Sequence, residues 1–182
     1  MSRLSSLSPE ALKAVFSPES DSDLLTLVTI YDPVITTKII ARLSDGVTQR
    51  ITTALEPGDL ITTDEEVIYG VVSNNKNYTF LPMQISLPSE DDSQAPRCSL
   101  VLNDVTRFLT PIIRTIVGPP KIKLELVLSK TPDRVEVSFA HFYISSFRYN
   151  RDSVTCELSM INYEREPFPM HSFNPPNFPG LF

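Results

Sequence analysis

The stretch Arg97-Cys-Ser-Leu-Val-Leu-Asn103 predicts a strand, and so does the stretch Lys121-Ile-Lys-Leu-Glu-Leu-Val-Leu128. Residues 104–117 and a Gly118-Pro119-Pro120 break join the two strands. Residues 121–127 alternate polar and apolar, which indicates a strand with one solvent-exposed face. Apolar residues within 104–117 recur at helical spacing, and Asn103 or Asp104 can cap this helix. Pro111 either kinks the helix or starts a second one. We expect this strand–helix–strand unit to form the centre of the domain.

Working outward, the flanking sequence is typical of short strands separated by turns. Residues 24–31 are apolar on both faces, and Asp45-Gly46 is a turn dipeptide after a strand at 38–43. Pro82 confines the strand 78–87 to an edge or a bulge. The remaining expected strands are 50–54, 67–72, 134–139, 142–149 and 154–163.

The two ends of the chain differ from this β pattern. Ser8-Pro9-Glu10 is a helix start, and Leu12, Val15 and Phe16 give that short helix one apolar face that must dock on something. Residues 166–182 contain five prolines, so they form neither a continuous helix nor a central strand. Four phenylalanines recur in this arm, and they favour an arm that lies along its own domain or along a neighbouring subunit: Phe168, Phe173, Phe178 and Phe182.

The sequence therefore predicts three regions: an N-terminal helix and linker (1–22), a β-rich domain (23–163) and a Pro/Phe-rich C-terminal arm (164–182). The expected fold class is mainly β with one or two helices (α+β), arranged as a compact antiparallel β-barrel or sandwich. Its central strand–helix–strand unit is expected to be an insertion, and its arm to be extended. The length of 182 residues suits one domain with a real core.

Composition excludes several classes of function. A net charge of −6 argues against a sequence-independent nucleic-acid binder, which needs a basic surface. No run approaches membrane-spanning length and no secretion signal is present, so we expect synthesis in the cytoplasm and no membrane insertion. Under these conditions Cys98 and Cys156 are expected to be buried free thiols rather than a disulfide.

Candidate chemistry is sparse. His141, expected between two strands, and His171 lack metal ligands at zinc spacing, and no nucleotide-binding or serine-hydrolase motif is present. The acidic groups at 64–66 and 90–92 lack the ligand ladder of a calcium loop and are expected to be solvated. Cys156 and His141 could meet across paired strands, although nothing in the sequence requires it. We expect no catalytic residue, no metal and no cofactor.

Several short segments carry a resemblance to a known family. Leu102-Asn103-Asp104-Val105-Thr106-Arg107 and Gly118-Pro119-Pro120 are two of them; the others are Asn77-Tyr78-Thr79-Phe80-Leu81-Pro82-Met83, Glu125-Leu126-Val127-Leu128 and Phe178-Pro179-Gly180-Leu181-Phe182. From about Asp23 to the last residue the chain resembles an uncharacterised family of bacteriophage tail proteins, the domain of unknown function 1833. More distantly, the run from Tyr78 to Gly118 is similar to the front part of the minor tail protein that forms the hub of lambda-like tails.

This resemblance implies a β domain of the tail-hub type and a structural protein of the virion. The expected location is the tail tip of a long-tailed phage, where a ring joins the tail tube to the receptor-binding part. The expected partners are further copies of the chain, as a trimer or alternatively a hexamer, together with the distal tail ring, the C-terminus of the tape measure and the central tip protein. The candidate interface residues are Leu12, Val15, Phe16, Phe168, Phe173, Phe178 and Phe182.

Three alternatives remain open from the sequence. A hexameric distal-tail ring or adaptor is the nearest one. A receptor- or carbohydrate-binding β module would use exposed aromatics, but the chain has no tryptophan, which sugar platforms commonly use. A tail assembly chaperone would be absent from the finished particle. For every candidate interface residue, ordinary packing within the chain is the competing explanation.

Overall fold

The computed structural model describes residues 7–17, 21–35, 38–56, 59–63, 66–86, 97–103, 116, 118–150 and 153–160. Within these residues a single sheet contains ten strands in the order β3-β4-β5-β2-β1-β8-β9-β10-β7-β6. Neighbouring strands are antiparallel except β2 and β5, which are parallel. The elements are α1 (Pro9–Phe16), β1 (Leu24–Tyr31), β2 (Ile39–Ser44), β3 (Gln49–Arg50), β4 (Tyr69–Ser73), β5 (Lys76–Phe80), β6 (Met83–Ser86), β7 (Arg97–Leu102), β8 (Lys121–Leu128), β9 (Thr131–Tyr149) and β10 (Val154–Ser159).

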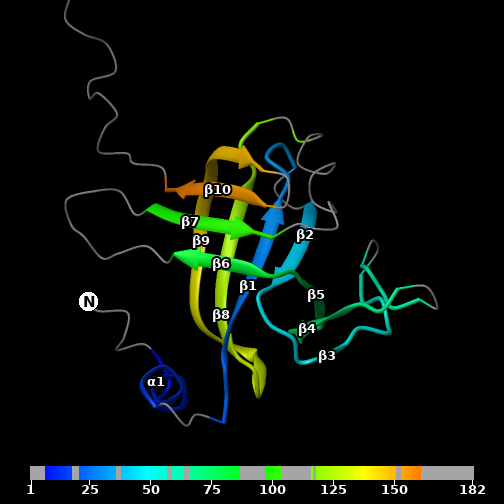
Figure 1. Cartoon of the computed structure of the whole chain (residues 1–182), viewed down its shortest axis with the longest axis vertical. Coiled ribbons are helices and arrows are strands. Elements are labelled where there is room, and N and C mark those ends of the chain that lie inside the picture. The colour runs from blue at the N-terminus through cyan, green and yellow to red at the C-terminus, as the bar shows by residue number, and fades with distance from the viewer. Residues whose placement is uncertain are drawn as a thin grey trace, which may run out of the picture.

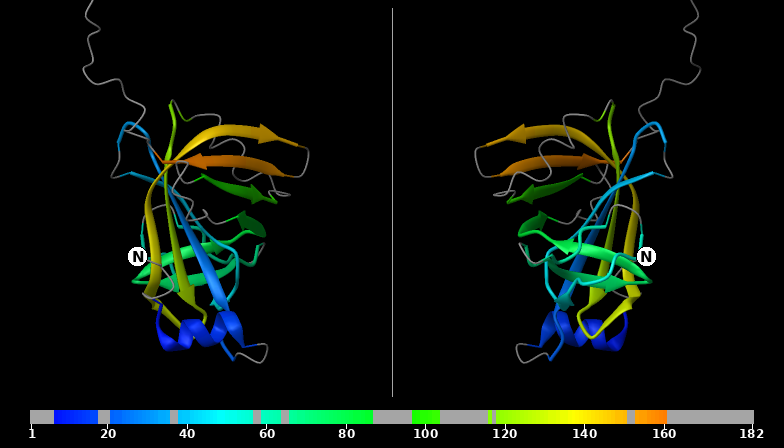
Figure 2. Two further views of the ribbon diagram at one scale, coloured as in Figure 1. Left: turned by 90° about the vertical axis from the view of Figure 1, so that its left-hand side faces the viewer. Right: turned by 90° about the vertical axis from the view of Figure 1, so that its right-hand side faces the viewer.

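The sheet folds over on itself because β9 belongs to two layers. The first part of this 19-residue strand pairs with β8, and its last part pairs with β10. Register shifts in the β8–β9 pairing allow the strand to bend. As a result β6, β7 and β10 run across β1 and β8 as a second layer (Figure 1), which is seen edge-on in Figure 2.

The main core fills the space between these two layers. Val28 and Ile30 of β1 and Leu124 of β8 point into it from one side, and Leu100 and Leu158 point into it from β7 and β10. All five side chains are buried. Alternate residues of a strand face opposite sides of the sheet, so each of these strands contributes every second residue to this core.

A smaller core lies on the opposite face of β1. Leu25 and Leu27 pack there against Val71 of β4 and Tyr78 of β5. The β4–β5 hairpin therefore covers this face, and burial on both sides explains why β1 is apolar throughout. The tip of the hairpin also contacts the start of β9, where the Asn74 backbone N–H donates to Asp133 at 2.6 Å.

The expected mainly β fold is confirmed as a large mixed sheet, with one helix among the described residues, but the expected barrel is not closed. Among the described residues the two ends of the sheet, β3 and β6, do not pair with each other. The parallel β2–β5 pair also departs from a purely antiparallel arrangement. The predicted helix at 104–117, apart from Ile116, and the C-terminal arm lie outside the described residues.

Several strand predictions need correction. The segments 134–139 and 142–149 are parts of one strand, so position 141 lies within β9 and not between strands. The segment 78–87 is divided, because β5 ends at Phe80 and β6 begins at Met83, with Pro82 between them. The strand expected at 50–54 is reduced to Gln49–Arg50, and the strand expected at 67–72 runs from Tyr69 to Ser73.

The expectation of one wet face for residues 121–127 is wrong at Glu125. Its side chain lies under the β4–β5 hairpin and is buried, and it forms an ion pair with Lys123 at 2.7 Å. The ammonium of Lys123 lowers the free-energy cost of burying the Glu125 carboxylate, because a buried charge is costly unless it is paired. No helix in the described part of the chain is long and apolar enough to cross a membrane.

Candidate functional site

The predicted helix α1 is present, and its apolar face is only partly used within the chain. Ser8 caps the helix by accepting a hydrogen bond from the Ala11 backbone N–H at 3.1 Å, and proline occupies the first turn. Ala11 is completely buried, and Leu12 is half-buried. In contrast, the side chains of Val15 and Phe16 are 48% and 70% exposed. The end of the helix therefore presents apolar side chains to solvent.

A buried carboxylate on β9 fixes the start of this helix. Glu136 accepts hydrogen bonds from the Ser8 backbone N–H and from Ser8 Oγ, both at 2.9 Å. Arg134 Nε lies 3.4 Å from the same carboxylate. Both Ser8 and Glu136 are buried, so the helix is held by charge-assisted hydrogen bonds in a region of low dielectric. The exposed Val15 and Phe16 therefore lie on a helix, α1, whose start is held to the sheet.

The other predicted interface residues, Phe168, Phe173, Phe178 and Phe182, lie outside the described residues. The structure therefore brings together only the helix part of the predicted interface.

An apolar groove, which the sequence did not predict, lies at the other end of the sheet beside β4 and β5. Its cavity is about 550 Å³. Val67 and Tyr69 stand on its wall with exposed fractions of 47% and 50%. Binding sites are commonly concave and lined mainly by apolar and aromatic side chains, as this groove is. The residues that line it are Leu43, Leu60, Glu66, Val67, Ile68, Tyr69, Thr79, Phe80, Leu81, Pro82 and Asn103. We call this feature the β4–β5 groove.

Gly70, which follows Tyr69 on β4, allows β4 to lie close to β5 beside the groove. A Cβ atom at this position would lie 1.9 Å from the Tyr78 carbonyl oxygen and 2.8 Å from Ile51 Cδ1. Only glycine permits so close an approach of the two backbones. A glycine within a strand is a local signal of such a close backbone approach, but it does not by itself specify a groove.

An ionic cluster supports the loop that leads into the groove. The guanidinium of Arg42 on β2 contacts the carboxylates of Glu56 and Asp59, the latter at 3.3 Å. Asp59 also accepts hydrogen bonds from the backbone N–H groups of Leu55 and Glu56, at 3.1 and 2.9 Å. Because Arg42 and Asp59 are both buried, this pair ties Leu55, Glu56 and Asp59 to the sheet just before Leu60 enters the groove.

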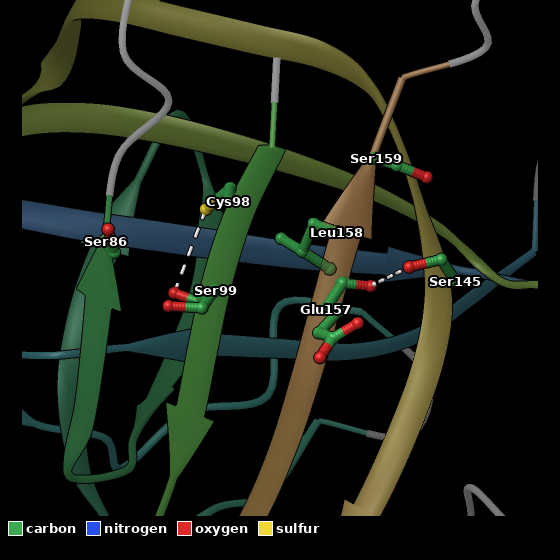
Figure 3. Close-up of a pocket in the computed structure, with 7 residues that line it drawn as sticks. All are labelled: Ser86, Cys98, Ser99, Ser145, Glu157, Leu158 and Ser159. Atoms are coloured by element: carbon green, nitrogen blue, oxygen red, sulfur yellow. Dashed lines mark hydrogen bonds between the residues drawn. The ribbon is translucent and has the colours of Figure 1, made fainter. Parts of the chain in front are cut away.

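A polar hollow of about 570 Å³ lies where β6, β7, β9 and β10 come together (Figure 3). It is lined by Ser86, Cys98, Ser99, Ser145, Glu157, Leu158 and Ser159. Figure 3 shows Ser145 beside Glu157, where Ser145 Oγ donates to the Glu157 backbone carbonyl at 2.9 Å. A serine that donates to a carbonyl has no base to accept its proton, so this arrangement does not activate it as a nucleophile.

The two thiols are free and buried, as expected. Burial raises the pKa of Cys98 to about 11 and the pKa of Cys156 to about 12, so both are neutral at physiological pH. The register places Cys156 opposite Phe147 on β9, well along the strand from position 141. The sequence left open that Cys156 and His141 meet across paired strands. These two positions are not opposite each other in the β9–β10 pairing.

Within the described ranges, no group of three or more His, Cys, Asp or Glu residues could hold a metal ion. Of the acidic residues in the two loops considered for calcium, only Glu66 is among the described positions, and it is exposed.

Comparison with known proteins gives one match. The model of a family described as a domain of unknown function, DUF1833, matches residues 10–134, which is more than half of the chain. The chain therefore belongs to the DUF1833 family. The match includes all of α1 except Pro9, the ionic cluster, the groove walls β4 and β5, and the central strands β1 and β8. No curated protein and no solved structure matches the chain.

Proposed function

We propose that the protein is a structural component of the distal tail of a long-tailed phage, a tail-tip hub. Copies of the chain form a closed ring that joins the tail tube to the receptor-binding tip, and the ring is a trimer. Its neighbours are the distal tail ring, the C-terminus of the tape measure and the central tip protein. The protein is not an enzyme in this proposal.

One structural observation carries the assembly part of this proposal. Phe16 is 70% exposed, yet it stands on a helix whose N-cap residue, Ser8, is hydrogen-bonded to Glu136 of β9. If a partner covered this ring, its burial would stabilise the contact by about 1.5–3 kcal/mol. This arrangement supports an interaction role over a freely diffusing monomer.

The phage part of the proposal is supported by the sequence resemblance of residues 23–182 to tail proteins. The hub-like region, 78–118, includes β6 and β7, which form much of the second layer. A folded β domain that presents docking surfaces suits a protein that is built into a larger structure.

Detection of the protein in finished particles tests this proposal. Particles of the phage that encodes the chain would be purified, analysed by mass spectrometry and labelled with gold-conjugated antibody. We expect the chain in the particles and the label at the tail tip. Absence of the chain from particles that assemble normally would overturn the proposal and would favour an assembly chaperone.

The oligomeric state tests the ring directly. Light scattering would give the mass of the intact chain and of a form cut after Tyr163. We expect a trimer for the intact chain, whereas a hexamer would favour the distal-tail ring. A truncated form that stays folded but becomes monomeric would show that the arm acts between subunits. A truncated form that only loses thermal stability would show that the arm packs on its own domain.

A further inference from the structure

Two surfaces of the described chain are complementary in shape, polarity and charge. The first, which we call the α1 tip, consists of Lys13, Val15 and Phe16. The second is the β4–β5 groove. We propose that the α1 tip of one copy docks in the β4–β5 groove of a second copy. This inference rests on the proposed ring and names the two faces that form its subunit contact.

Shape and polarity fit this pairing. The groove of about 550 Å³ has room for an aromatic side chain and its aliphatic neighbour, and its floor and walls include Leu43, Tyr69 and Phe80. On the α1 tip, Val15 and Phe16 are 48% and 70% exposed. Aromatic side chains such as Phe16, Tyr69 and Phe80 pack favourably with each other in edge-to-face arrangements. Docking would remove exposed apolar surface from both partners at once.

The charges at the two surfaces are opposite. Lys13 lies one helical turn before Phe16 and therefore on the same side of α1, and its side chain is exposed. Glu66 lies at the groove, and its side chain is exposed as well. When Phe16 enters the groove, the ammonium of Lys13 and the carboxylate of Glu66 can pair at its rim. Such a rim pair contributes mainly to orientation and to the rate of association.

The two surfaces lie on different sides of the molecule. Figure 1 shows α1 at the lower left and the β3–β5 end of the sheet at the right. The tip therefore docks in another copy and not in its own groove. A contact between two different surfaces of identical chains is heterologous, and it closes into a ring when the rotation between copies permits.

Both surfaces are held in place before they meet. The Ser8–Glu136 hydrogen bonds fix α1, and the Arg42–Asp59 pair fixes the loop that leads to Leu60. Preorganised surfaces lose less conformational entropy on association, so a small contact can be effective.

Single substitutions on the exposed side chains test each surface. Phe16→Ser and Val67→Asp would be measured by analytical ultracentrifugation of the full chain, with circular dichroism to confirm the fold. Because both positions are exposed, folding should be retained. We expect each variant to raise the dissociation constant of self-association about tenfold or more. Val34→Asp is the matched control, since Val34 is 78% exposed but lies in the turn after β1, outside both surfaces.

A mixing experiment tests whether the two surfaces meet each other. Phe16→Ser removes the tip but keeps the groove, and Val67→Asp does the opposite. At a protein concentration at which each variant alone is monomeric, an equal mixture should form a one-to-one heterodimer through its single intact contact. A mixture that stays monomeric would overturn the proposal. Charge reversal adds a second reading: Lys13→Glu and Glu66→Lys should each weaken association, and the double variant should restore it.

The outcomes separate this inference from the proposed function. If the wild-type chain forms a ring that Phe16→Ser and Val67→Asp leave intact, the docking contact is wrong and the ring remains. If the wild-type chain stays monomeric at its solubility limit, the docking contact is also overturned. The detection of the chain in phage particles then decides the proposed function independently.

Discussion

Ser8 and Glu136 lie 128 residues apart in the sequence and are joined by two hydrogen bonds of 2.9 Å. Ser8, the N-cap of α1, donates both of them to the buried carboxylate of Glu136 on β9. One side chain thus caps α1 and is itself held by the sheet. The cap serine is therefore both a local helix signal and a long-range anchor, and only the first of these can be inferred from the sequence.

Loss of this anchor should destabilise the protein. Glu136→Gln removes the charge and turns one acceptor into a donor that faces Ser8. We expect the free energy of unfolding, measured with urea, to fall by about 1–3 kcal/mol. Glu157→Gln is the matched control, because Glu157 is half exposed and pairs with Arg148 at the surface, where a change within about 0.5 kcal/mol is expected. Equal losses for the two variants would contradict the anchoring role.

The two carboxylates around Arg42 should contribute unequally. Asp59 is buried and accepts two backbone hydrogen bonds, whereas the side chain of Glu56 is 41% exposed. We expect Asp59→Asn to lower the free energy of unfolding by about 1–3 kcal/mol, and Glu56→Gln by about 0–1 kcal/mol. Urea unfolding in low and high salt checks this order. Salt should reduce only the smaller effect, because screening acts mainly on exposed pairs.

Replacement of Gly70 by alanine should be costly. The added Cβ would meet the backbone carbonyl oxygen of Tyr78 at 1.9 Å, and this contact can be relieved only by separating β4 from β5. We expect a loss of about 3 kcal/mol in the free energy of unfolding. Gly46→Ala is the control, because the atom that it meets is Cδ2 at the end of the Leu25 side chain and not a backbone atom, and about 1 kcal/mol is expected there. The reverse order, measured by thermal melting, would show that the β4–β5 approach is not close.

The buried thiols should make stability depend on alkaline pH. In the folded chain the pKa values of Cys98 and Cys156 are raised to about 11 and about 12, from an ordinary value of 9.0. Their contribution is therefore complete below pH 9 and is lost as the pH rises from 9 to about 11 for Cys98 and to about 12 for Cys156, by about 1.4 kcal/mol per pH unit for each thiol. Unfolding of the wild type and of the Cys98→Ala/Cys156→Ala variant would be compared over this range. Tyr78, whose pKa is also raised by burial, is present in both and does not affect the difference.

The same burial predicts slow thiol chemistry. In native protein at pH 8 both thiols should react slowly with Ellman's reagent, because little thiolate is present and access is restricted. Both should react quickly once the chain is unfolded in guanidinium chloride. Rapid reaction of either thiol in the native protein would show that its strand opens readily.

The sequence predicts a strand well where the hydrophobic pattern within that strand and the turns beside it are sufficient to define it. The strands β1 and β8 were expected at nearly their observed bounds, because hydrophobic alternation and flanking turns are local signals. The burial of Glu125 was not foreseen, since the alternation of Lys121, Lys123 and Glu125 carries no information about the hairpin that covers them. Likewise β9 looked like two strands because its bulges interrupt the period.

The candidate site, too, is only partly predictable from the sequence. The apolar side chains Val15 and Phe16 were visible as one face of a capped helix. The groove was not, because its walls come from Leu43, Leu60, Tyr69 and Phe80, which a parallel pairing of β2 with β5 brings together. Parallel pairs join segments that are distant in sequence, and no local pattern specifies them.

β9 also determines how the domain bears mechanical load. A single covalent backbone from Thr131 to Tyr149 runs through both layers of the sheet. A pulling force applied to the β10 layer is therefore transmitted along peptide bonds to the β8 layer, and not across the apolar contact between them. The layers can therefore separate only when the hydrogen bonds of β9 to β8 or to β10 are broken, so those two ladders and not the apolar contact should set the force at which the domain yields.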